Sequence, residues 1–242
     1  MNYDDAPYAD DCAEGFYYTL GNAGWKLSFN YGDALAWESD FEKSSVGGSD
    51  RYFVDDVDFA FFAGHGDSGK IGFSTNYDGD GNYEKQVHYS EVKWGDRDLE
   101  WMTLVTCDTL DPDYKEEWIA HACAGNHLHA LLGFKTKIEP SDAKVLGTTF
   151  ADYLLDGKGI KDAWKTATKE KCDLPWWKEL ICNCKTEAAI IYPRVYFETY
   201  LIHNYAEETL PNQGNYIGTD PSYYTAENGY SVAYYYESWV CG

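Results

Sequence analysis

Three apolar runs of strand length stand out in the first two thirds of the chain. Residues 57–63 are nearly continuous in large apolar side chains, and similar runs follow at 102–106 and 129–134. Runs of this length are typical of strands that are covered on both faces within a parallel sheet. We therefore expect these three segments to form the centre of a parallel sheet.

Helical and turn-rich segments lie around these runs. Strict alternation of large apolar and polar residues at 25–31 predicts a strand with one buried face, and the turn-rich stretch 70–92 indicates a hairpin. Helical spacing predicts helices at 11–20, 34–43 with Asp33 as N-cap, 116–124, 145–155 and 160–171. Strands that alternate with helices indicate an α/β fold, a three-layer sandwich with a mostly parallel central sheet.

The pattern changes after Cys172. Short strand-like segments at 188–191, 195–200 and 231–236 are separated by polar loops that are rich in glycine, asparagine, tyrosine and proline. We expect residues 1–185 to form the α/β domain. Residues 186–242 should form a β-rich, tyrosine-rich C-terminal extension that packs on the same domain.

Charge excludes two classes of partner. The chain carries 19 basic and 41 acidic side chains, a formal net charge of −22. Nucleic acids and anionic lipid surfaces attract basic proteins, so neither partner is expected. The apolar runs are far shorter than the roughly 20 residues that a membrane-spanning helix needs, so membrane insertion is not expected. A hydrophobic content of 44% and an aromatic content of 17% indicate a folded chain.

Seven cysteines leave at least one thiol unpaired if the others form disulfides. Cys12 and Cys241 lie near opposite termini, where a disulfide between them would hold both ends in place. The first residues show neither the basic nor the apolar region of a signal peptide. Because acidity, many tyrosines and few methionines fit an exported surface, we expect an extracellular or cell-surface protein whose leader is absent from this chain.

Two of the central strands end in reactive residues. Gly64, His65 and Gly66 follow the run 57–63, and Cys107 follows the run 102–106. The carboxyl ends of parallel strands meet at one edge of a sheet, where ligands bind in α/β proteins. A thiol nucleophile needs a neighbouring base, and an imidazole one strand away supplies it.

Together, these motifs resemble the caspase-like cysteine peptidase superfamily, which includes caspases, legumain, gingipains and clostripain. The resemblance rests on the apolar strand that leads into His65-Gly66 and on the later apolar strand that ends in Cys107. The motifs Gly32-Asp33 with 36–41, 94–101, 131–134 and 147–152 are still more similar to an uncharacterised family of exported prokaryotic caspase-like proteins. The resemblance covers roughly residues 10 to 220.

The resemblance implies a caspase-like fold and hydrolysis of peptide bonds in a peptide or protein substrate through an acyl-enzyme. Cys107 would be the nucleophile, and His65 would polarise the carbonyl or protonate the leaving amine. The N–H groups of Gly66 and Cys107 would form the oxyanion hole, and no cofactor is required for this chemistry. The carboxylates of Asp67 and Asp108, with the negative field of the chain, favour a basic residue at P1, the residue whose carbonyl is attacked.

In a second interpretation, the chain has the caspase-like fold but is not catalytic. His65 would then be a loop histidine, and Cys107 would be a buried thiol or a disulfide partner of Cys123. Because a fold does not fix a function, the chain would then act as an extracellular structural, self-assembling or binding protein. The tyrosine-rich segment 216–239 fits such an assembly surface, and a homo-oligomer would follow from it.

Two groups of residues have the side chains of a metal site. Asn76, Asp78 and Asp80 place oxygen ligands at alternate positions and resemble the start of a calcium-binding EF-hand loop, although position twelve is Val87 and not glutamate. An acidic hairpin turn is the alternative. The imidazole and thiolate groups that suit a transition metal occur at His121, Cys123, His127 and His129.

Overall fold

A six-stranded mixed sheet forms the centre of the computed structural model, which describes residues 6–73, 85–172, 185–211 and 219–242. Its strands run in the order β1-β5-β6-β7-β8, and β9 also pairs with β7. They are β1 (Phe59–Ala63), β5 (Trp101–Val105), β6 (Ala130–Phe134), β7 (Glu187–Phe197), β8 (Tyr200–Asn204) and β9 (Tyr230–Val240). A second sheet contains β2 (His65–Asp67), β3 (Lys70–Gly72) and β4 (Gln86–His88).

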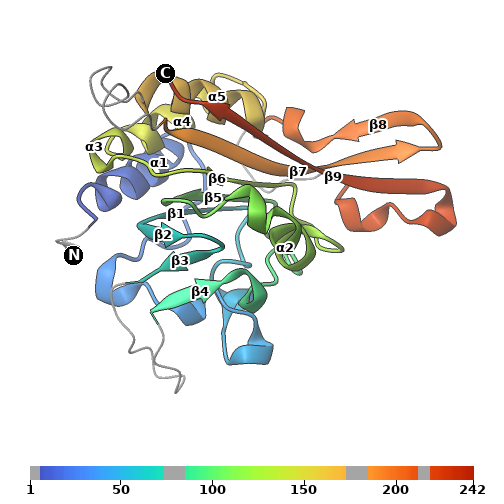
Figure 1. Cartoon of the computed structure of the whole chain (residues 1–242), viewed down its shortest axis with the longest axis horizontal. Coiled ribbons are helices and arrows are strands. Elements are labelled where there is room, and N and C mark those ends of the chain that lie inside the picture. Colours follow the sequence, from blue (N-terminus) through green and yellow to red (C-terminus); the bar gives the residue numbers. More distant parts are fainter. Residues whose placement is uncertain (1–5, 74–84, 173–184, 212–218) are drawn as a thin grey trace.

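Only the first three strands of the large sheet are parallel. β1 pairs with β5 and β5 with β6 in parallel, whereas β6–β7, β7–β8 and β7–β9 are antiparallel. The α/β class and the central strands are therefore as expected, but the sheet is mixed and not mostly parallel. Through β7, the predicted C-terminal extension continues the same sheet, and Figure 1 shows the β7–β8–β9 ribbon projecting from the body.

The three longest helices gather on one face of the sheet. The helices are α1 (Ala9–Asn22), α2 (Lys115–Trp118), α3 (Pro140–Ala143), α4 (Leu146–Leu155) and α5 (Ile160–Lys171). Figure 1 shows α1, α4 and α5 on one side of β1, β5 and β6, with α2 and the small sheet on the other. The predicted helices at 11–20, 145–155 and 160–171 are confirmed, whereas 116–124 splits into α2 and a π-helical turn at Ile119–Cys123.

Alternate residues of β1 face two separate hydrophobic cores. Phe59 and Phe61 pack against the core that includes α1, α4 and α5, and Phe16 of α1 stacks on Phe61 with ring centroids 4.5 Å apart. Ala60 and Phe62 belong to the core on the opposite face of the sheet. Successive side chains of a strand point to opposite faces of the sheet. The apolar run of β1 therefore contributes side chains to the cores on both faces.

The long strand β7 contains a proline, Pro193. The sequence predicts separate strands at 188–191 and 195–200, whereas β7 runs continuously from Glu187 to Phe197. β6 pairs with β7 as far as Ile191, and β8 pairs with it from Arg194 onward. On this edge Pro193 falls between two pairing segments, a position at which a sheet tolerates proline, while on the other edge β9 pairs with β7 across it.

Two local predictions in the N-terminal region are wrong. The segment 25–31 forms no strand, and 34–43 contains two 3-10 turns, Asp33–Leu35 and Glu38–Asp40, in place of a helix. Asp33 is not the N-cap but has a positive φ of 63° inside the first turn. Tertiary packing overrides weak local preference here, since 38–40 is buried.

The cysteines of the described ranges are free thiols. Cys12 and Cys241 are both buried in the same core as Cys172, and the expected bridge between Cys12 and Cys241 is not formed. Burial raises the pKa of Cys12 to about 12, which makes this thiol unreactive. Within the described part of the chain, none of the helices is both long enough and apolar enough to cross a membrane.

Candidate functional site

The carboxyl ends of β1 and β5 lie side by side. Ala63 pairs in register with Val105, and the Gly64 N–H donates to the Val105 carbonyl at 3.2 Å. His65 and Cys107 each follow two residues after this last pair. The sheet therefore brings both residues to one edge, as the sequence predicts for parallel neighbours.

Gly66 packs directly on the loop that carries Cys107. A Cβ at Gly66 would lie 2.8 Å from the Cys107 carbonyl oxygen and 2.6 Å from the Thr106 Cβ. Atoms are not found at such separations, so only glycine allows this approach. The His65-Gly66 segment and the Cys107 loop are thus in contact through their backbones.

The hydroxyl of Thr109 fixes the loop after β5. It donates to the Cys107 carbonyl at 3.2 Å, lies 3.4 Å from the Lys70 carbonyl and bonds to the Thr106 hydroxyl. Between Cys107 and Thr109 in the chain, Asp108 has a positive φ of 55°. Aspartate adopts this conformation more readily than most residues do. The small sheet and the Cys107 loop are consequently held as one unit.

The Cys107 thiol is half-buried and protonated at rest. It donates a weak hydrogen bond to the Ile138 carbonyl at 3.8 Å. Burial raises the pKa of Cys107, Asp108 raises it further, and the Ile138 contact and Lys137 only partly oppose them. Attack by this sulfur would therefore require its proton to be removed as the substrate binds.

Carboxylates lie near Asp108, the residue that follows Cys107. Burial raises the pKa of Asp108, and the nearby carboxylates Asp67 and Asp111 add to the shift, while Lys137 opposes it. His65 is exposed at this edge and pairs in register with Gly72 of β3. The edge thus offers an accessible imidazole and a negative local field.

The structure tests only one of the two metal predictions. Asn76, Asp78 and Asp80 lie outside the described residues. In the ranges that the structure describes, no three histidine, cysteine or acidic side chains are arranged to hold a metal ion. Among the transition-metal candidates, His121 faces Glu117 at 3.8 Å, and Cys123 is buried in the core that contains Ala60 and Phe62.

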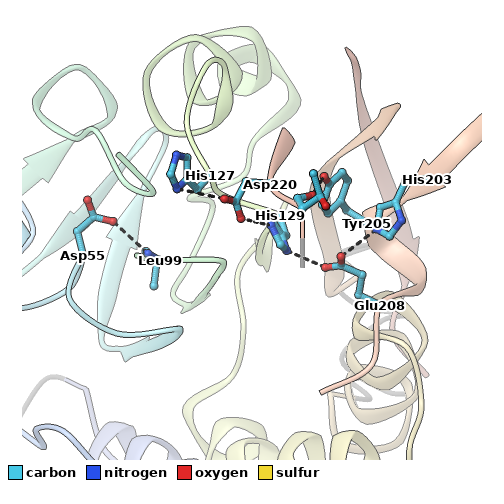
Figure 2. A network of polar contacts seen from close by, with 9 residues as sticks. Asp55, Leu99, His127, His129, His203, Tyr205, Glu208 and Asp220 are labelled. Atoms are coloured by element: carbon cyan, nitrogen blue, oxygen red, sulfur yellow. Dashed lines mark hydrogen bonds and ion pairs between the residues drawn. The ribbon is translucent and has the colours of Figure 1, made fainter. Parts of the chain in front are cut away.

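The histidines near β6 belong instead to a network that the sequence did not indicate. Buried His129 binds Glu208 through Nδ1 at 2.8 Å and Asp220 through Nε2 at 3.3 Å. Asp220 also faces His127 at 3.5 Å, and Glu208 faces His203 at 2.9 Å. Figure 2 shows these side chains in a row, with three imidazoles alternating with two carboxylates.

This histidine–carboxylate row has a structural role. Burial lowers the pKa of His129, but the hydrogen bonds and charges of Asp220 and Glu208 outweigh it, so the pKa is raised. The His129 imidazole between two carboxylates links the C-terminal segment to the amino end of β6. That end of the parallel strands is opposite the end that carries Cys107, so the row is not part of the candidate site.

Comparison with known proteins gives a family without an activity. Residues 1–178 match the model of a family described as a domain of unknown function, DUF6345, and the chain belongs to this family. No match was found among curated proteins. The function therefore has to be inferred from the site itself.

Proposed function

We propose that this chain is a caspase-like cysteine endopeptidase that uses Cys107 and His65. The observation that carries the proposal is the juxtaposition of the two strand ends, in which Gly66 touches the Cys107 carbonyl. The three parallel strands with helices on one face and a small sheet on the other support the caspase-like arrangement. That Cys107 is a free thiol supports its role as nucleophile.

The proposed reaction begins with the protonated thiol of Cys107. The Cys107 sulfur attacks the carbonyl carbon of the scissile amide as its proton passes to His65. His65 returns the proton to the leaving amine, and a thioester remains on the enzyme. Water then attacks the thioester, the acid is released and the thiol is restored.

The oxyanion of each tetrahedral intermediate would accept from the N–H groups of Gly66 and Cys107. A preorganised backbone donor of this kind contributes about 3 kcal/mol to the stability of such a transition state. Gly66 is suited to the role because nothing bulkier fits against the Cys107 loop. For P1, the proposed preference is arginine or lysine, supported by Asp108, which adjoins Cys107, and by Asp67 near Asp108.

A non-catalytic protein of the same fold is the second candidate. The observation that favours it is the raised pKa of Cys107, since many thiol nucleophiles have a lowered one. The projecting ribbon of β7, β8 and β9, with Tyr200 and Leu201 exposed, would then serve as an assembly surface.

Peptidyl acyloxymethyl ketones distinguish the two candidates, because the thiolate displaces their carboxylate and leaves a mass tag. We expect one adduct, on Cys107, formed about tenfold faster with arginine than with aspartate at P1, a difference of about 1.4 kcal/mol. His65→Ala should slow it at least tenfold, whereas His88→Ala, which alters a histidine bonded to Ser90, should not. The absence of an adduct on Cys107, or a reaction indifferent to P1 and to His65, would overturn the peptidase proposal.

A further inference from the structure

One face of the edge strand β1 opens into a cavity. Its volume is about 540 Å³, and it lies between β1, α1 and the segment 25–33. The side chains of Phe59 and Phe61 line it and remain only half-buried, although the apolar run of β1 predicts full burial on both faces. An aromatic strand face that its own chain leaves partly uncovered can bind a ligand.

The walls of the cavity are aromatic on three sides. α1 contributes Phe16, which packs against Phe59 and Phe61 with ring centroids 4.9 Å and 4.5 Å apart. The segment 25–31 contributes Trp25 and Phe29, two residues of the apolar set in its alternating pattern. That alternation therefore supplies a cavity wall here and not a strand.

The size of the cavity indicates the kind of occupant. Sites for small organic molecules are concave, mostly apolar and about 300–1,000 Å³ in volume. A cavity of about 540 Å³ lies within this range. It matches a molecule with one or two aromatic rings or a short acyl chain.

The rim of the cavity sets the charge of the ligand. Asp10 and Glu14 of α1 and Asp98 of the β4–β5 connection are exposed carboxylates that line it. Lys26 is the one lysine or arginine among the described residues of the lining. A positively charged group at this rim would be attracted, and an anionic group would be repelled.

We propose that this cavity binds a cationic amphiphile, with its apolar body against Phe59 and Phe61 and its ammonium group at the carboxylate rim. Aromatic faces such as that of Trp25 add a cation–π attraction for a quaternary ammonium group. The cavity extends to Gly64 and Gly72, beside the start of β2, so the bound molecule would lie under the strand that carries His65. The site itself needs no activity of Cys107 and stands apart from the proposed peptidase.

Three fluorescent probes with the same diphenylhexatriene body test the proposal: the trimethylammonium derivative, the neutral parent and the propionic acid derivative. We expect the cationic probe to saturate a single site and to bind at least tenfold more tightly than the anionic probe. The difference should shrink in 1 M salt, because exposed charges are screened there. Equal affinity for all three probes, or several sites per chain, would overturn the proposal.

Variants on α1 locate the site. Ala13→Trp should fill the cavity and abolish binding, since Ala13 lines it. Glu14→Gln should weaken the cationic probe about threefold without touching the core, because Glu14 is exposed. Asp11→Asn is the matched control on the same helix, where Asp11 faces Lys144 at 3.7 Å outside the cavity, and should change nothing. If Ala13→Trp does not fold, equal effects of Glu14→Gln and Asp11→Asn still contradict the assignment.

Discussion

Cys107→Ala is expected to lower kcat/KM for a peptide with arginine at P1 by about 1,000-fold or more, because the covalent route is lost and only binding and oxyanion contacts remain. The measurement is hydrolysis of a fluorogenic arginyl peptide by purified variants. Cys123→Ala is the control, since Cys123 is a buried free thiol on the opposite face of the sheet.

His65→Ala should act on the same step. A positioned general acid or base typically contributes about 100-fold or more to a rate, so a loss of that order is expected in kcat. Thermal unfolding of each variant shows that the fold is kept. Hydrolysis that survives in Cys107→Ala, or falls equally in Cys123→Ala, would contradict the assignment of the nucleophile.

His129→Leu is expected to destabilise the folded chain by about 3 kcal/mol, since it removes the buried imidazole that two carboxylates share. Glu208 and Asp220 are the carboxylates concerned, and His129 itself is fully buried. Urea unfolding measures the loss. His121→Leu, which alters a partly exposed histidine 3.8 Å from Glu117, should cost less than about 1 kcal/mol.

The contribution of His129 should also depend on pH. Its folded pKa is raised, so the stabilisation is complete below the unfolded value of about 6.5 and is lost as pH rises through the folded pKa. The difference in stability between the wild type and His129→Gln should therefore be largest near pH 6 and smaller near pH 9. A difference that grows with pH would mean that His129 is neutral in the folded chain.

The candidate site was predictable because its signals are local. Each reactive residue follows a strand-length apolar run, and parallel neighbouring strands bring their carboxyl ends together without further information. The contact between Gly66 and the Cys107 carbonyl then follows from the pairing of Ala63 with Val105. The carbonyl of Ile138, which lies 31 residues beyond Cys107, could not be placed in the same way.

The rest of the structure depends on contacts between distant residues. His129 contacts Glu208 and Asp220, which lie 79 and 91 residues later in the sequence. No local spacing predicts a contact over such a separation. Apolar and polar residues do alternate at 25–31, but among the described residues no strand pairs with this segment. Its aromatic side chains line a cavity. The sequence pattern also predicts two strands where β7 is continuous through Pro193. Whether a strand tolerates a proline depends on where its neighbours pair with it, here β6 and β8, and the local sequence does not give these positions.

Cleavage of a complex peptide mixture tests the central claim most directly. The mixture is incubated with the wild type and with Cys107→Ala, and new peptide termini are identified by mass spectrometry. The account predicts new termini after arginine or lysine with the wild type and none with Cys107→Ala. An absence of new termini with the wild type, or the same termini with both proteins, would contradict it.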